Sequence, residues 1–150
     1  MSIKETLQAD LNTAIKSRNS VVAETIRMVL TAITNEEVAG KEKKELSDAE
    51  IITVLTREAK KRREAAEAFE AGGRADRAAT ERAEGEVIAG YLPEQLSEDD
   101  VKKLIAETIA AVGAAGPSDM GKVMGALKAK VAGKAEGALV SSLVKEALNK

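Results

Sequence analysis

The side chains that most enzymes use for acid–base, nucleophilic or metal chemistry are scarce in this sequence. Its 150 residues include no histidine and no cysteine, which removes the commonest general base, the commonest metal ligand and any thiol nucleophile. The acidic pairs Glu36 with Glu37 and Asp99 with Asp100 are adjacent, so on helices the two side chains of each pair point about 100° apart. We therefore predict no catalytic residue, no metal site and no cofactor.

Residues 116–123, GPSDMGKV, come close to the phosphate-binding loop G-x-x-x-x-G-K-[ST]. That loop needs a preceding strand and a serine or threonine hydroxyl for magnesium. Here a helical pattern precedes the segment, and Val123 stands in place of the hydroxyl residue. We interpret the segment as the start of a helix capped by Ser118, with Gly121 and Gly125 as structural positions where another backbone packs closely.

Lysine gathers near the C-terminus. Residues 118–150 hold six lysines and three acidic residues, a net charge of +3, although the whole chain carries −2. Lysine binds nucleic-acid phosphates independently of base sequence, while the lack of aromatic residues in this segment excludes base stacking. The predicted RNA-binding residues are Lys122, Lys128, Lys130 and Lys134.

A second basic run is formed by Lys60, Lys61, Arg62 and Arg63. One interpretation is a phosphate-binding patch. The other is a solvated helix face, because glutamates interleaved at a spacing of four residues cancel much of the positive field. We favour the solvated face and keep the run as a secondary candidate.

Helices must carry these candidates. Alanine, glutamate, lysine, arginine and leucine are abundant, proline is rare, and apolar residues recur at helical spacing. The pattern predicts an all-α protein with an N-terminal helical bundle, residues 1–92, and a small C-terminal three-helix module, residues 93–150. The helix starts are predicted at the N-caps Ser2, Ser20, Ser47, Ser97 and Ser118.

The boundary between the two modules is predicted at YLPEQLSEDD, residues 91–100. Pro93 lacks an N–H and disfavours α geometry at Leu92, so the incoming helix must end near Tyr91. Ser97, with Asp100 three residues later, can form a capping box that starts the next helix. Tyr91, Leu92 and Pro93 are therefore the predicted hinge.

No apolar run approaches the roughly 20 residues that span a bilayer. The opening residues MSIKETLQADL have the pattern of an amphipathic helix rather than a signal peptide. We expect a cytoplasmic protein without a membrane partner.

Five stretches of the sequence are distinctive: REAKKRREAAEAF (57–69), GRAD (73–76), YLPEQLSEDD (91–100), DMGKVMGALKAK (119–130) and GKAEGALV (133–140). Together they resemble the GatB/YqeY family, and in particular its free-standing YqeY members. The resemblance covers nearly the whole chain. It implies an all-α fold, with a helical bundle followed by a small three-helix module. It also implies kinship with the tail of the B subunit of the glutamyl/aspartyl-tRNA amidotransferase, a module that contacts tRNA.

The resemblance carries a family-level label of carbon–nitrogen ligase with glutamine as amido donor, but the domain responsible for that chemistry has no counterpart here. The leading hypothesis is therefore a non-catalytic tRNA-binding accessory module. The alternative is a protein-interaction module that docks on a translation-related enzyme, such as an amidotransferase or an aminoacyl-tRNA synthetase. An enzyme in its own right is a third hypothesis, disfavoured by the lack of histidine and cysteine.

Overall fold

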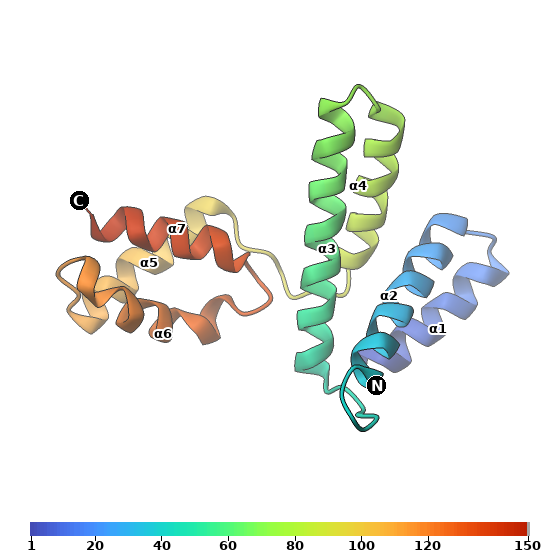
Figure 1. Ribbon diagram of the computed structural model, residues 1–150, viewed down its shortest axis with the longest axis horizontal. Helices are drawn as coiled ribbons and strands as arrows, with labels where there is room; N and C mark the ends of the chain where they lie inside the picture. Colours follow the sequence, from blue (N-terminus) through green and yellow to red (C-terminus); the bar gives the residue numbers. More distant parts are fainter. Residues whose placement is uncertain (150) are drawn as a thin grey trace. The chain divides into compact units, whose positions relative to one another are not determined.

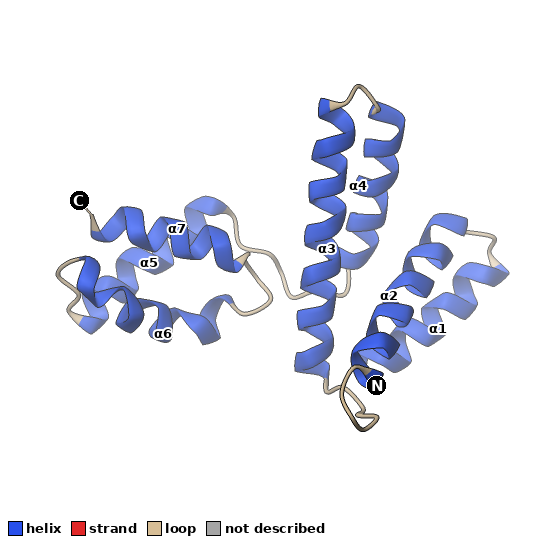
Figure 2. Cartoon of the chain, in the orientation of Figure 1, coloured by secondary structure: helices blue, strands red, loops and turns tan. Residues whose placement is uncertain are grey.

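A computed structural model describes residues 1–149 of the chain. The described residues form seven α-helices and one short 3₁₀ helix, and they contain no β-strand (Figure 2). The prediction of an all-α protein is thus confirmed. The chain divides into two compact units, Met1–Leu92 (unit 1) and Pro93–Lys150 (unit 2).

Unit 1 consists of two helical hairpins, which lie side by side in Figure 1. The first pairs α1 (Ile3–Lys16) with α2 (Ser20–Val38), and the second pairs α3 (Asp48–Ala71) with α4 (Ala75–Ala89). Ser2 and Ser47 cap α1 and α3, as predicted, and each forms a capping box with the glutamate three residues later. The α3–α4 turn passes through Gly73 at φ +77°. Glycine adopts this conformation without strain, whereas residues with a side chain do not.

The predicted cap at Ser20 is wrong by one residue. Asn19 has the non-helical backbone of a cap, and its side-chain oxygen accepts the N–H of Val22 at 3.3 Å, so Ser20 becomes the first helical residue. The chain reaches Asn19 through Arg18, which lies at φ +59°. Asparagine and serine cap helices almost equally well. The geometry of the turn, and not a preference for one residue type, therefore makes Asn19 the cap.

The core of unit 1 is aliphatic and receives residues from all four helices. Its buried members are Leu7, Ile26, Val29, Ile33, Leu46, Ile51, Val54, Leu55 and Ile88. Burying apolar side chains of this size contributes about 1.5–3 kcal/mol each. Apolar packing is therefore a main contribution to holding the two hairpins together.

The segment between α2 and α3 is anchored by one buried carboxylate. Glu37 is 3% exposed; its side chain accepts hydrogen bonds from Lys4 Nζ at 3.0 Å and from the N–H of Leu46 at 3.3 Å. The Lys4 hydrogen bond, followed by that from Leu46, holds the pKa of Glu37 below its ordinary value. Residues 39–45 are exposed between these anchors.

Unit 2 contains three α-helices, α5 (Glu98–Val112), α6 (Met120–Val131) and α7 (Gly137–Leu148), with the 3₁₀ helix η1 (Pro117–Asp119) before α6. The predicted capping box of Ser97 and Asp100 is present at the start of α5. The helices enclose a separate aliphatic core. It consists of Val101, Ile105, Val123, Leu127, Val131, Val140, Leu143, Val144 and Leu148.

The predicted cap at Ser118 is replaced by a different arrangement. Ser118 lies inside η1, and α6 begins after Asp119. The Asp119 carboxylate turns back to accept the N–H of Ala115 at 2.8 Å, so it closes the preceding loop instead of capping α6. That hydrogen bond is the main reason why the pKa of Asp119 is lowered.

Candidate functional site

Helix α6 differs from the other α-helices of the described chain in its charge. It contains Lys122, Lys128 and Lys130 and no acidic residue, whereas each of the other six includes at least one glutamate or aspartate. A helix with charge of one sign attracts polyanions over a wider range than a helix with interleaved charges. This makes α6 the main candidate for an anionic ligand.

The core contacts of α6 determine which side faces solvent. Val123, Leu127 and Val131 are buried, and at about 100° per residue the opposite side carries Gly121, Gly125 and Ala129. All three of these are exposed. We call the side formed by Gly121, Gly125 and Ala129 the open face.

Two of the four lysines border the open face. The helical positions of Lys122 and Lys128 lie on its two sides, and Lys130 lies beyond Lys122. All three are exposed, and Lys134 is half-buried in the turn after α6. This turn is fixed to the start of unit 2, because Leu96 donates its N–H to the Lys134 carbonyl at 2.8 Å. The structure thus brings Lys122, Lys128 and Lys130 onto one helix and holds Lys134 at its end.

None of the four lysines forms an ion pair with any other residue among positions 1–149. No carboxylate forms an ion pair with these side chains, although the Asp119 carboxylate, just before α6, is near enough to Lys122 for the two charges to attract each other. By contrast, Lys102 on α5 lies 3.7 Å from Glu98. A ligand phosphate near α6 would not have to displace an internal carboxylate from these side chains.

The glycines of α6 do not have the predicted packing role. A Cβ atom added at Gly121 or at Gly125 would meet no heavy atom within 4 Å. Each glycine inside a helix costs about 1 kcal/mol relative to alanine, and no close contact in unit 2 accounts for this cost. The interpretation that another backbone of the chain packs against these glycines is wrong for unit 2.

The second basic run is not one surface. Arg62 is turned toward α2 and α4, with a side chain only 12% exposed. Its Nη1 donates to Glu58 at 3.2 Å, its Nη2 contacts Met28 Sδ at 3.3 Å, and its Nε lies 3.2 Å from Glu84, outside hydrogen-bond geometry. Burial, followed by repulsion from Glu81, raises the pKa of Glu84, and Arg62 opposes that rise.

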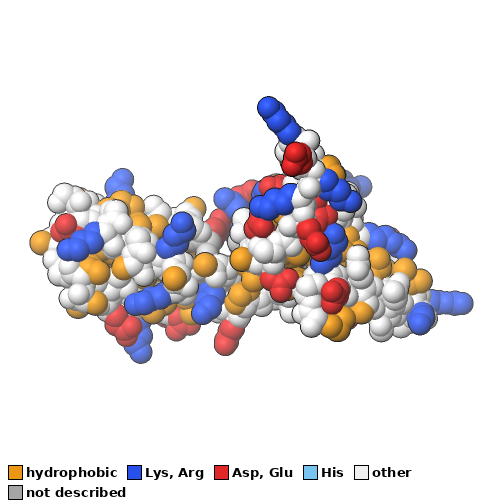
Figure 3. Space-filling view, turned by 90° about the horizontal axis from the view of Figure 1, so that it is seen from below, with side chains coloured by type: hydrophobic (Ala, Val, Ile, Leu, Met, Phe, Trp, Pro, Cys, Tyr) orange, Lys and Arg blue, Asp and Glu red, His pale blue; other side chains and the backbone are white. Residues whose placement is uncertain are grey.

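The remaining residues of that run are exposed on α3. Lys60 lies 3.9 Å from Glu64, and Lys61 lies 3.5 Å from Glu58; Arg63 is exposed. Figure 3 shows basic and acidic side chains closely mixed over the visible face of unit 1. These contacts favour the interpretation as a solvated, internally paired helix face.

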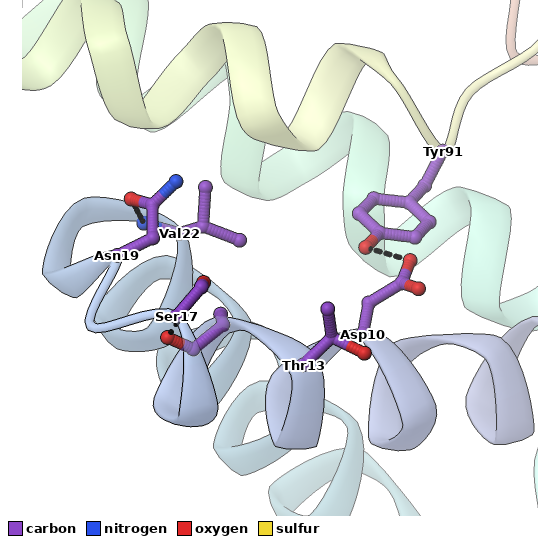
Figure 4. A pocket seen from close by; sticks show the side chains of 7 residues that line it. Asp10, Thr13, Ser17, Asn19, Val22 and Tyr91 are labelled. Atoms are coloured by element: carbon purple, nitrogen blue, oxygen red, sulfur yellow. Dashed lines mark hydrogen bonds between the residues drawn. The ribbon is translucent and has the colours of Figure 1, made fainter.

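The predicted hinge residues divide between the two units. Tyr91 and Leu92 pack against the core of unit 1, and Pro93 begins unit 2. The Tyr91 hydroxyl donates a hydrogen bond to Asp10 Oδ2 at 2.5 Å, which connects the end of α4 to α1 (Figure 4). Burial and the contact with Asp10 raise the pKa of Tyr91. Sequence reasoning missed Asp10, because no local spacing relates it to a residue 81 positions away.

Within the described residues, no three histidine, cysteine, aspartate or glutamate side chains are grouped so that they could hold a metal ion. Nor does any helix in that part of the chain combine the length and apolar character needed to cross a bilayer.

A comparison with known protein families identifies a family that the chain matches over nearly its whole length. The family model described as Yqey-like protein matches residues 4–148. A comparison with curated proteins gives no match.

Proposed function

Because the chain belongs to the YqeY family, we propose that it is a non-catalytic tRNA-binding accessory protein whose unit 2 contacts RNA phosphates. The observation that carries this proposal is the set of unpaired lysines on and after α6, a helix without an acidic residue. Lysines of this kind release counterions when they bind a nucleic-acid backbone, which is favourable at low salt. The resemblance to the tail of an amidotransferase subunit supports tRNA as the RNA.

The open face of α6 suits a polymer backbone. Lys122 and Lys128 border a surface that includes Gly121 and Gly125, where no side chain projects. A ribose–phosphate chain can approach such a surface closely while lysines on either side reach its phosphates. Unit 2 contains no aromatic residue, so the contacts would follow the shape of the RNA backbone rather than its bases.

The alternative is a protein-interaction module that docks on an amidotransferase or an aminoacyl-tRNA synthetase. The same glycine positions favour it, since small residues let a partner helix approach closely, and the chain as a whole carries a net charge of −2. In that case the lysines of α6 would help to select the protein partner, and the protein would function without binding RNA.

Fluorescence anisotropy with labelled bulk tRNA at low salt tests the proposal. Lys122→Glu combined with Lys128→Glu should weaken binding by about tenfold or more, because two phosphate contacts are replaced by repulsion. The matched control is Lys102→Glu combined with Lys103→Glu, which makes the same charge change on exposed residues of α5 and should have a much smaller effect.

Two outcomes would contradict the proposal. If both pairs of substitutions weakened binding equally, α6 would not be the site. If the unaltered protein bound no tRNA at low salt, the protein-docking alternative would replace it.

A further inference from the structure

Unit 1 contains a pocket that none of the lysine sites involves. It has a volume of about 230 Å³, and its lining includes Asp10 and Thr13 of α1, Ser17 directly after α1, Asn19 and Val22 at the start of α2, and Tyr91 after α4. Figure 4 shows Asp10 and Thr13 on α1 and Ser17 at its end, with Tyr91 reaching Asp10 from the end of α4. Asp10, Thr13 and Ser17 lie on one side of this helix and its end, because they are separated by three and four positions.

The lining is rich in acceptors and poor in donors. The hydroxyl hydrogens of Thr13 and Ser17 are used by the carbonyls of Ala9 and Ala14, and that of Tyr91 is used by Asp10. Each of these three hydroxyl oxygens can still accept a hydrogen bond.

The remaining polar groups add to this imbalance. Asp10 accepts only the Tyr91 hydroxyl through Oδ2, so Oδ1 has no partner among residues 1–149. Asn19 accepts the N–H of Val22, and its amide group provides the one donor that the lining side chains leave free. The lining side chains therefore offer five acceptor groups and a single donor group, the Asn19 amide.

The charge of the lining also favours a cationic ligand. Asp10 is its one ionisable carboxylate, no lysine or arginine lines the pocket, and no basic side chain of the described chain pairs with Asp10. A carboxylate in such surroundings forms strong, charge-assisted hydrogen bonds with cationic donors. Anions such as phosphate would be repelled.

From this arrangement we propose that the pocket binds a guanidinium group. A guanidinium presents five donors in a planar fork, and it packs on aromatic and aliphatic carbon better than an ammonium does. Asp10 Oδ1 takes the charged donors, the hydroxyl oxygens of Thr13 and Ser17 take further N–H groups, and Val22 and the Tyr91 ring contact the alkyl stem. The group belongs either to a small alkylguanidine or to an arginine side chain of a polypeptide.

The test is a titration of the full chain, followed by the amide chemical shifts of ¹⁵N-labelled protein. The probes are n-butylguanidinium, its uncharged isostere n-butylurea, and the peptide Gly-Ala-Arg-Ala-Gly. We expect saturable shifts at Asp10, Thr13, Asn19 and Tyr91 with n-butylguanidinium and none with n-butylurea. Tighter binding of the peptide than of n-butylguanidinium would identify a polypeptide as the source, and equal binding would identify a small cation.

Two variants place the site. Asp10→Asn keeps an acceptor for Tyr91 but removes the charge, and it should weaken n-butylguanidinium binding about tenfold or more. Thr13→Val removes one acceptor without touching the Tyr91 contact, and it should weaken binding severalfold. The matched control is Thr34→Val on α2, whose hydroxyl also donates to the carbonyl four residues earlier; this variant should bind normally.

The inference is overturned if n-butylguanidinium causes no saturable shift, or if n-butylurea shifts the same amides. It is also overturned if a folded Asp10→Asn or Thr13→Val variant, checked by circular dichroism, binds as the unaltered protein does.

Discussion

Arg62 Nε of α3 lies 3.2 Å from Glu84 Oε2 of α4, and the two side chains are 12% and 15% exposed. The same guanidinium donates to Glu58 within α3. The longer hairpin of unit 1 is therefore joined by a largely buried ion pair in addition to its apolar contacts.

We expect Arg62→Leu to destabilise the protein by about 2–3 kcal/mol, since it leaves Glu84 without its cation in a poorly solvated place and leaves Glu58 with the exposed Lys61 alone. Chemical denaturation measures the change. Lys61→Leu is the matched control, because Lys61 is adjacent, also lies near Glu58, and is 61% exposed; its effect should stay within about 0.5 kcal/mol. Equal effects of the two substitutions would show that Arg62 acts as an ordinary surface residue.

Glu37 should make stability depend on pH. Its pKa is lower in the folded chain than its ordinary value, chiefly because of the hydrogen bond from Lys4, so the unfolded chain binds more protons in this range. Glu37 thus adds stability at neutral pH, and this contribution is lost as pH falls from the ordinary glutamate range through the lowered pKa. We expect Glu37→Gln to be less stable than the unaltered protein at pH 7 and to approach it in acid.

The control for that comparison is Glu36→Gln. Glu36 is the neighbouring residue, is 46% exposed and pairs with Arg57 at 3.3 Å on the surface. In urea denaturation at several pH values, the difference in unfolding free energy between Glu36→Gln and the unaltered protein should change little. If the stability difference between Glu37→Gln and the unaltered protein were constant between pH 7 and pH 3, the charge of the Glu37 carboxylate would not be the source of its stabilising effect.

Two glycine substitutions separate stability from RNA binding. A Cβ at Gly85 of α4 would meet Arg62 Cβ at 3.7 Å, an ordinary contact, and a Cβ at Gly125 would meet nothing within 4 Å. Gly85→Ala and Gly125→Gln should therefore each stabilise their helix by about 0.5–1 kcal/mol. Only Gly125→Gln should weaken tRNA binding, because its side chain projects from the open face. Equal tRNA affinity of the two variants would exclude close approach of RNA to Gly125.

Unit 2 should fold without unit 1. It has its own buried aliphatic cluster, and its first residues are tied to it through Leu96 and through Gln95, whose side chain donates to the Gly133 carbonyl at 2.7 Å. We expect a peptide of residues 93–150 to be helical and to melt cooperatively by circular dichroism. A non-cooperative transition with unprotected amides would show that unit 2 depends on unit 1.

The exposed loops and the boundary between units 1 and 2 should be the first sites of limited proteolysis. The exposed residues 39–45 and the turn at Gly72 and Gly73 should be cut early, together with the segment near Pro93. A first cut inside α3 or α6 would contradict the assignment of these loops.

Local chemistry was sufficient to predict most helix boundaries. Ser97 and Asp100, three residues apart, specify a capping box by themselves, and Pro93 ends the preceding helix for steric reasons that need no tertiary contact. The errors occurred where two polar neighbours compete. Asn19 rather than Ser20 caps α2, and Asp119 closes a loop that leaves Ser118 inside η1.

The candidate sites were predictable only in part. The positive segment around Lys122 follows from composition, as does its lack of aromatic residues. The inward orientation of Arg62 depends on Glu84 and Met28, which approach it from other helices. The contact of Tyr91 with Asp10, and the pocket beside it, likewise require two helices to be placed in space before they can be found.

The central claim is that lysines of unit 2 neutralise RNA phosphates. The most direct test is the salt dependence of tRNA binding for the unaltered protein and for Lys122→Ala, Lys130→Ala and Lys134→Ala. With three or four phosphate contacts, log affinity should fall linearly with log salt, by about 0.7–0.9 per contact, and each substitution should flatten the slope by about one unit. An unchanged slope in all three variants, or no binding even at low salt, would contradict the account.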